Sequence, residues 1–237
     1  MSKFYVTVLG SIGPAEKYLD SIDGWFKNIQ QQSMFKWIEF IVVYSEWHEI
    51  YDKYKHLTNV FFHKETGKSV YEAWSQAAEL ASTKYCINWN IDDRFYPKAI
   101  EKKFIVLEKN PDIGLVYNWT NVTNIENDDP SDAKGIWRQF RWLSPDDPNW
   151  DKQCNGGPDP MWRKELYDQT GPFNGKEYPV AADWDKWMSF KKLAGIHLIT
   201  QPLCLYFLNP VGVSTSENGR KRNAIDDQKI LKKYEVV

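Results

Sequence analysis

The segment from Tyr85 to Pro97 constrains this chain more than any other. It reads Tyr-Cys-Ile-Asn-Trp-Asn-Ile-Asp-Asp-Arg-Phe-Tyr-Pro, so an apolar run of strand length is followed at once by two carboxylates, Asp92 and Asp93. In an α/β pattern such acids lie at the carboxyl edge of the sheet, where open α/β sheets bind ligands. Two carboxylates there suit a divalent cation shared with phosphate oxygens. A pair of solvated loop acids is the alternative reading.

Strand and helix patterns alternate along most of the sequence. Short apolar runs predict strands at residues 5–9, 38–43, 60–62, 85–89, 113–117, 198–200 and 203–207. Apolar residues at helical spacing predict helices over 15–30, after Ser69, after Pro97 and from Asp183. Glu72 follows Ser69 by three residues, which is typical of a capped helix start. The alternation predicts one α/β domain, Rossmann-like, with a mostly parallel central sheet flanked by helices.

Three segments do not follow this alternation of strand and helix patterns. Residues 124–157 are rich in Asp, Asn, Pro and Trp and predict a long loop, of a kind that is usually functional or mobile. Residues 156–171 predict a Gly-Pro turn and a short helix over 161–168. The polar residues from Asn209 onward, with three basic residues at 220–222, predict a flexible tail.

Composition excludes several classes of protein. Hydrophobic residues make up 42% of the chain and charged residues 26%, as in globular rather than disordered or fibrous proteins. A net charge of −2 gives no basic footprint for nucleic acid.

The three cysteines, Cys86, Cys154 and Cys204, have no paired spacing and predict neither a disulfide framework nor a zinc site. No stretch is apolar over the roughly 18 residues of a membrane span, and no signal pattern begins the chain, so we expect a cytoplasmic protein, with peripheral membrane contact left open.

Three motifs together resemble the inverting GT-A fold glycosyltransferases of the family 2 type. They are Val70-Tyr71-Glu72-Ala73-Trp74, Asn90-Ile91-Asp92-Asp93-Arg94 with Pro97, and Gly171-Pro172-Phe173 followed by Ala181-Ala182-Asp183-Trp184-Asp185-Lys186-Trp187. The similarity spans roughly residues 5–214. It implies a GT-A domain over residues 1–215, with a nucleotide-sugar-binding half (1–95) and an acceptor-binding half (96–215), followed by a polar C-terminal tail (216–237).

The resemblance also implies an activity and its main groups. Such enzymes move a sugar from a nucleotide-diphosphate-sugar to an acceptor hydroxyl with inversion and with Mn²⁺ or Mg²⁺. By position, Asp93 would bind the metal, while Asp92 would contact the donor ribose or support the metal. Asp183 matches the general base that removes the acceptor proton, and Asp185 is the second candidate for that base.

Further positions suggest donor and acceptor contacts. Ser11 matches a position that touches the donor base, Lys68 could reach the diphosphate, and Glu46 stands near the place of an acidic pair common in the family. The aromatic faces of Trp137, Trp142 and Trp184 are the candidate acceptor contacts, since sugars stack on such rings.

Two departures from the family pattern bear on these roles. Tyr44-Ser45 replaces the acidic pair, which leaves the donor nucleotide open. Leu208-Asn209-Pro210 stands where the family often has a His, and Asn209 is a candidate weaker ligand in its place.

Two other functions fit parts of the pattern. A nucleotidyltransferase that forms nucleotide-sugars also has an α/β sheet with acidic metal ligands, but it needs a Gly-rich loop with Arg and Lys, which Gly10–Pro14 lacks. An inactive relative that only binds glycans would fit the twelve Trp and the missing acidic pair, but would have no need of Asp92, Asp93 and Asp183. Both stay as alternatives, and the acceptor could be a lipid-linked glycan, a polysaccharide end, a protein or a modified nucleic-acid base.

Overall fold

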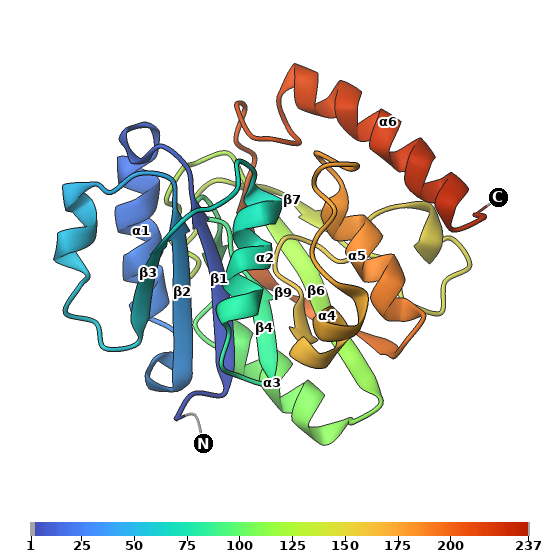
Figure 1. The fold of residues 1–237 in the computed structure, drawn as a ribbon, viewed down its shortest axis with the longest axis horizontal. Helices are drawn as coiled ribbons and strands as arrows, with labels where there is room; N and C mark the ends of the chain where they lie inside the picture. Colours follow the sequence, from blue (N-terminus) through green and yellow to red (C-terminus); the bar gives the residue numbers. More distant parts are fainter. Residues whose placement is uncertain (1–2, 237) are drawn as a thin grey trace.

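The chain forms one mixed sheet with helices on both faces (Figure 1). The computed structural model describes residues 3–236. Its strands are β1 (Val6–Ile12), β2 (Ile38–Tyr44), β3 (Val60–Lys64), β4 (Tyr85–Asn88), β5 (Arg94–Phe95), β6 (Ile113–Thr123), β7 (Ile136–Phe140), β8 (Met161–Arg163) and β9 (Gly195–Phe207). Its α-helices are α1 (Leu19–Gln30), α2 (Val70–Leu80), α3 (Ala99–Lys109), α4 (Lys164–Thr170), α5 (Ala182–Lys191) and α6 (Glu217–Lys233).

The sheet runs in the order β3-β2-β1-β4-β8-β6-β9-β5, with β7 paired to β6 outside this path. The first four strands of that order are parallel to one another. Beyond β4 the sheet is mixed, because β8 is antiparallel to β4 and β6, whereas β6 and β9 are parallel. The expected α/β architecture is therefore confirmed, and its parallel part is the N-terminal half.

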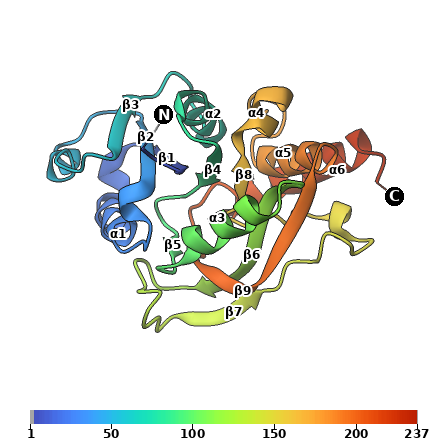
Figure 2. The ribbon, with the colours of Figure 1, turned by 90° about the horizontal axis from the view of Figure 1, so that it is seen from below.

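Two apolar layers hold the helices to the sheet. Helices α1 and α3 pack on one face against Val6, Val8 and Phe40, and helices α2, α4 and α5 pack on the other against Leu9 and Ile41. Neighbouring strand residues point to opposite faces, so each buried strand supplies both layers. Figure 2 shows α1 and α2 on opposite sides of the strands. Among residues 3–236, no helix is both long enough and apolar enough to cross a membrane.

Several local expectations were wrong in their bounds. Residues 10–12, which lie beyond the strand expected over 5–9, continue β1, and a Cβ on Gly10 would lie only 2.7 Å from the Trp25 ring. The long loop over 124–157 contains the edge strand β7. Met161–Arg163, expected to start a helix, is the buried strand β8. Such a short strand depends on pairing with β4 and β6, which are distant in sequence, and no local pattern reveals it.

The expectation of a flexible tail is wrong for residues 217–233, which form α6. Ser216 caps this helix, since its Oγ accepts from the Gly219 amide at 3.1 Å. Ile230 is fully buried, and Asp226 Oδ2 accepts from the Val180 amide at 2.9 Å. The helix is polar on most of its surface because only one face contacts the body, which explains why composition suggested a tail.

A buried ion pair inside this fold yields a stability prediction. Lys103 of α3 and Asp159 are both fully buried, and the Lys103 ammonium also donates to the Asp159 carbonyl at 2.6 Å. Because Lys103→Met leaves the Asp159 carboxylate without its partner, we expect the free energy of unfolding to fall by about 3–5 kcal/mol in urea denaturation. The control is Lys109, which is exposed on the same helix. Lys109→Met should change the free energy of unfolding by less than about 1 kcal/mol. Equal losses in both variants would contradict this role of the pair.

Candidate active site

The carboxyl ends of the parallel strands open onto a cavity of about 770 Å³. Ser11 near the end of β1, Ser45 after β2 and Asp92 after β4 all line it. The other walls are formed by parts of α2, the start of α5, one face of α6 and residues 208–215. Ligands of open α/β sheets bind at this edge, and the volume is typical of ligand pockets. The cavity is therefore the candidate active site.

The two carboxylates of the acidic turn face different surroundings. Asp92 lines the cavity, and Asn209 Nδ2 donates to its Oδ2 at 3.1 Å. Asp93 is fully buried, where its carboxylate accepts from the Phe207 amide at 3.2 Å and from Asn90 Nδ2 at 3.3 Å. Asp92 thus presents its carboxylate to a ligand, whereas Asp93 ties the turn to β9.

A buried arginine fixes the backbone of this turn. Arg94 Nη1 donates to the Ile91 carbonyl at 2.7 Å and to the Asp93 carbonyl at 2.6 Å. Its Nη2 donates to the Ser21 carbonyl of α1 at 3.0 Å and to Asn127 Oδ1. The guanidinium therefore connects the acidic turn to α1 and to the loop after β6.

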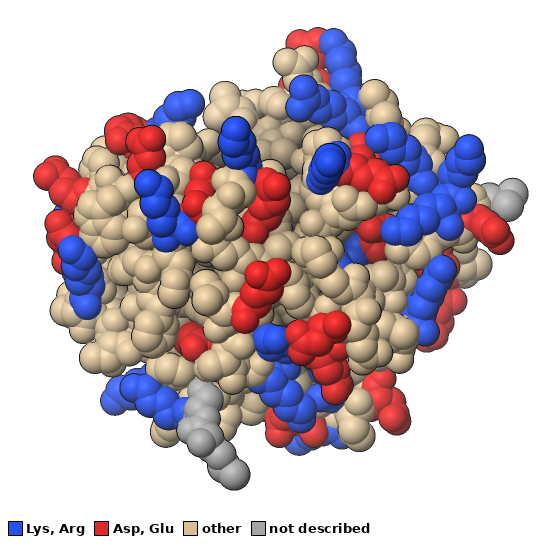
Figure 3. All heavy atoms as spheres, in the orientation of Figure 1, with Lys and Arg blue, Asp and Glu red and all other residues tan. Residues whose placement is uncertain are grey.

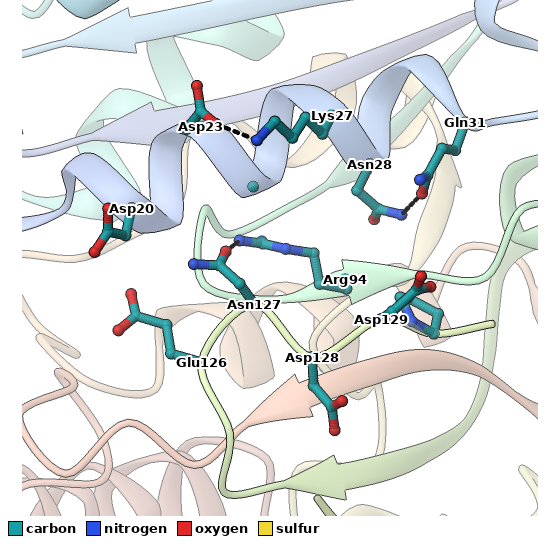
Figure 4. Close-up of a pocket in the computed structure, with 12 residues that line it drawn as sticks. Asp20, Asp23, Lys27, Asn28, Gln31, Arg94, Glu126, Asn127, Asp128 and Asp129 are labelled. Atoms are coloured by element: carbon teal, nitrogen blue, oxygen red, sulfur yellow. Dashed lines mark hydrogen bonds and ion pairs between the residues drawn. The ribbon is translucent and has the colours of Figure 1, made fainter. Parts of the chain in front are cut away.

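Arg94 also lines a second cavity, of about 480 Å³ (Figure 4). Figure 4 shows Arg94 and Asn127 pointing toward each other beside α1. Carboxylates dominate its wall, from Asp20, Asp23, Glu126, Asp128 and Asp129. Apart from the supporting Arg94, it gathers none of the side chains that the sequence motifs single out.

The larger cavity is rich in negative charge. Its wall contains the carboxylates of Glu65, Asp92, Asp183 and Asp227, and Lys68 is its only Lys or Arg among residues 3–236. Burial raises the pKa of Asp92, and burial together with the Asp92 charge raises the pKa of Asp93 well above its usual range. Since a cation would offset this charge, the wall suits a hard divalent cation, which takes carboxylate and amide oxygens.

The protein alone provides few ligands for such a cation. Across residues 3–236, no three His, Cys, Asp or Glu side chains are arranged so that they could hold a metal ion. Mg²⁺ and similar ions are commonly held by one or two carboxylates, with phosphate oxygens and water completing the shell. The Asp92 carboxylate and its neighbour Asn209 fit this partial coordination.

Asp183 stands at the start of α5 and lines the same cavity. Its Oδ1 lies 3.3 Å from the Tyr71 hydroxyl, which is also within 2.7 Å of the Val180 carbonyl. Burial raises the pKa of Asp183 to about 6, although hydrogen bonds from the Trp184 amide and from Tyr71 act in the opposite direction. A carboxylate with a pKa near 6 is suited to accept a proton at neutral pH.

Asp185, two residues further along α5, points away from the cavity. Its Oδ1 accepts from Lys233 Nζ at 2.6 Å and from the Tyr234 hydroxyl at 3.0 Å. Residues two apart on a helix do not share a face, so Asp183 and Asp185 cannot both reach one ligand. Asp185 instead anchors the C-terminal end of α6.

Three of the four donor-binding residues named from the sequence line the cavity, and the fourth does not. Ser11 and Lys68 line the cavity, together with Asp92. Glu46 is exposed in the bend after β2, and Ser45 faces the cavity in its place. The Ser45 hydroxyl is buried without a hydrogen-bond partner among the described residues.

The three tryptophans named from the sequence also lie in different places. Trp142 lines the cavity, and its Nε1 donates to Thr120 Oγ1 at 3.2 Å. Trp137 lies on the edge strand β7 with 54% of its surface exposed, outside the cavity wall. Trp184 is 2% exposed and packs in the core beneath α5, so its ring is closed to a ligand. Trp142 is thus the candidate that could contact a bound sugar.

Several polar residues of the wall were not singled out as site residues from the sequence, among them Ser45, Glu65, Asn223 and Asp227. Ser45 and Glu65 follow the ends of β2 and β3, so the polar residues after each strand were an available signal. Asn223 and Asp227 project from α6. No signal pointed to these two, because the segment had not been recognised as a helix.

Comparisons with known proteins identify the fold. No family model matches the sequence, and no curated protein matches it. Residues 1–349 of S. aureus TarS in complex with UDP-GlcNAc match 98% of this chain and 72% of their own length, with a TM-score of 0.69 and 14% identity. The chain spans 43% of the longer TarS structure. The mannosyltransferase PcManGT from Pyrobaculum calidifontis, in complex with GDP-Man and Mn²⁺, matches with a TM-score of 0.68 and 14% identity over 98% of this chain and 65% of its own. The GT-A fold expected from the motifs is confirmed.

Proposed function

We propose that this protein is a metal-dependent glycosyltransferase that moves a sugar from a nucleoside-diphosphate-sugar to an acceptor hydroxyl with inversion. One observation carries the proposal: a single cavity joins the strand-end hydroxyls, the accessible carboxylate Asp92 and the buried carboxylate Asp183. The similarity in fold to a protein solved with UDP-GlcNAc and to a mannosyltransferase solved with GDP-Man and Mn²⁺ supports it.

The donor would bind across the ends of β1, β2 and β4. Ser11 and Ser45 offer hydroxyls to the nucleoside, and Lys68 offers one positive charge to the diphosphate. One ammonium among four carboxylates is too little to hold a diphosphate, which is itself doubly charged or more. This imbalance supports the need for a cation at the site.

Asp92 is the residue that we propose to hold the cation, with Asn209 beside it. Bound there, Mn²⁺ or Mg²⁺ would supply positive charge that stabilises the departing diphosphate. Asp93 fits a supporting role, because its buried carboxylate already accepts hydrogen bonds from Phe207 and Asn90.

Asp183 would act as the general base. As the acceptor oxygen forms its bond to the anomeric carbon, the bond from that carbon to the diphosphate oxygen breaks, and the acceptor proton passes to the Asp183 carboxylate. The nucleoside diphosphate leaves with the bonding electron pair. A single displacement of this kind inverts the anomeric configuration. The location of Asp183 in the cavity wall and its raised pKa both support its role as the base.

The pH dependence of turnover follows from the pKa of Asp183. Only the carboxylate form accepts a proton, so we expect kcat/KM to rise with pH through about 6 and then level off. Tyr71→Phe removes a hydrogen bond that lowers this pKa, so the rising limb should move to higher pH. The matched control is Tyr167→Phe, because the Tyr167 hydroxyl contacts the Ser75 carbonyl and lies outside the cavity wall. If the rising limb of the kcat/KM profile lies at the same pH in Tyr71→Phe as in wild type, the assignment of Asp183 as the base is contradicted.

The activity itself is tested by release of nucleoside diphosphate from UDP-, GDP- and dTDP-sugars, with Mn²⁺ or with a chelator. We expect one donor family to react with Mn²⁺ and none to react in chelator, and NMR of the product should show the inverted anomer. Pyrophosphate release from a nucleoside triphosphate and a sugar phosphate would instead indicate a nucleotidyltransferase. Glycan binding without any turnover would indicate an inactive relative.

A further inference from the structure

The inner face of α6 brings two polar side chains into the cavity beside Asp183. Asn223 and Asp227 are four residues apart, so they lie on one face of the helix, and Asn223 Nδ2 donates to Asp227 Oδ2 at 2.9 Å. The Asp227 charge is close enough to raise the pKa of both Asp183 and Cys154. An amide and a carboxylate therefore stand next to the proposed base.

The contacts of α6 with the body fix the position of these two side chains. Asp226, between them in sequence, accepts from the Val180 amide three residues before Asp183. One turn further, Ile230 is fully buried, and Lys233 and Tyr234 both bond to Asp185 of α5. The helix is thus attached along its length to the start of the element that carries Asp183.

An aromatic wall belongs to the same cavity. Phe140 and Trp142 line it with their ring centroids 5.1 Å apart, and both are half-buried. The Trp142 Nε1 is occupied by Thr120, which leaves the apolar ring face for a ligand. Aromatic faces suit the C–H faces of sugars, while amides and carboxylates bind sugar hydroxyls.

The basic residues of α6 are arranged differently. Lys221 pairs with Glu217 at 2.7 Å, and Lys229 donates to the Glu177 carbonyl at 3.2 Å, both outside the cavity wall. Figure 3 shows Lys and Arg side chains gathered on the outer surface over α6. Within the cavity, α6 contributes a negative charge from Asp227 and no positive charge, and Lys68 is the only Lys or Arg of the wall among residues 3–236. This wall disfavours a phosphorylated or otherwise anionic acceptor at the reacting unit, since like charges repel.

We propose that α6 forms the acceptor subsite, in which Asn223 and Asp227 bind hydroxyls of a neutral saccharide that lies against Trp142. This inference rests on the proposed glycosyltransferase activity and adds the acceptor class to it. The reacting hydroxyl of that saccharide would then face Asp183, which takes its proton as described above. Specificity for a neutral sugar unit then comes from α6.

The test compares neutral hexose disaccharides with their 6-phosphates as acceptors, in wild type and in Asn223→Ala and Asp227→Asn. Hydrogen bonds to charged groups contribute about 1.5–3 kcal/mol, so Asp227→Asn should raise the KM for the neutral acceptor roughly 10- to 100-fold. Asn223→Ala should raise it roughly 10-fold. The donor dissociation constant, measured by calorimetry with Mn²⁺, should be unchanged, because both residues project from α6, whereas the donor is proposed to bind across the ends of β1, β2 and β4. Gln228→Ala, on the exposed side of α6, is the matched control and should change neither constant.

Each result has a defined meaning. A neutral acceptor KM that is unchanged in both variants, or a wild-type preference for the 6-phosphates, would overturn the subsite. A rise in the donor dissociation constant equal to the rise in acceptor KM would overturn it as well, because it would indicate general damage. If wild type binds no donor and transfers no sugar, the underlying glycosyltransferase proposal fails instead, which separates the two failures.

Discussion

Asp183→Asn is expected to reduce kcat about 10²- to 10⁴-fold while the donor dissociation constant stays the same. The amide is nearly isosteric with the carboxylate and can still lie beside Tyr71, but it cannot accept a proton at neutral pH. General-base catalysis typically contributes a factor of that size. Steady-state kinetics with saturating donor, together with calorimetry of donor binding, measure the two quantities separately.

The matched control for this variant is Asp185→Asn on the same helix. Because Asp185 bonds to Lys233 and Tyr234 outside the cavity, its loss should lower the unfolding temperature and change kcat by much less than the Asp183 substitution. A larger loss of kcat in Asp185→Asn than in Asp183→Asn would reverse the assignment of the base.

Asp92→Asn is expected to remove the effect of Mn²⁺ on donor binding. In wild type the cation offsets the negative charge of the cavity wall, so the donor should bind far more tightly with Mn²⁺ than with a chelator. Without the Asp92 carboxylate, donor affinity in Mn²⁺ should fall at least about 10-fold, toward the value in chelator, because hydrogen bonds and contacts to charged groups contribute about 1.5–3 kcal/mol. Calorimetric titration of the donor under both conditions measures this.

Asp93→Asn is the informative partner of that experiment. Asp93 is fully buried and bonded to Phe207 and Asn90, so we expect its substitution to lower the unfolding temperature and to leave a clear difference between Mn²⁺ and chelator. If instead only Asp93→Asn abolishes the effect of Mn²⁺, Asp93 is the metal ligand, as the motif alone had suggested.

The sequence predicts those parts of the fold that are set by local patterns. Strand β4 and the acidic turn after it follow from one apolar run and two carboxylates, and the start of α2 follows from Ser69, whose Oγ accepts from the Glu72 amide at 3.2 Å. Strand β8 and helix α6 were missed because each depends on partners distant in the chain. β8 is only three residues long and lies between β4 and β6 in the sheet. α6 buries few apolar side chains, Ile230 among them.

For the candidate site, motifs located the residues but not the direction of their side chains. Asp183 and Asp185 read alike in sequence, and only the position of α5 separates the one that enters the cavity from the one that holds α6. The same holds for Trp142 and Trp184, since one lines the cavity and the other is 2% exposed in the core. Asn223 and Asp227 could not be predicted as site residues before the helix that carries them was known.

The most direct test of the central claim is thermal unfolding of the wild-type protein with UDP-, GDP-, dTDP- and CMP-sugars, each with Mn²⁺ and with a chelator. A ligand at about 100 times its dissociation constant stabilises the folded state by about 2.7 kcal/mol, which raises the midpoint by several degrees. We predict such a rise for one nucleotide family, in Mn²⁺ only. No rise with any donor, or an equal rise in chelator, would contradict a metal-dependent nucleotide-sugar site.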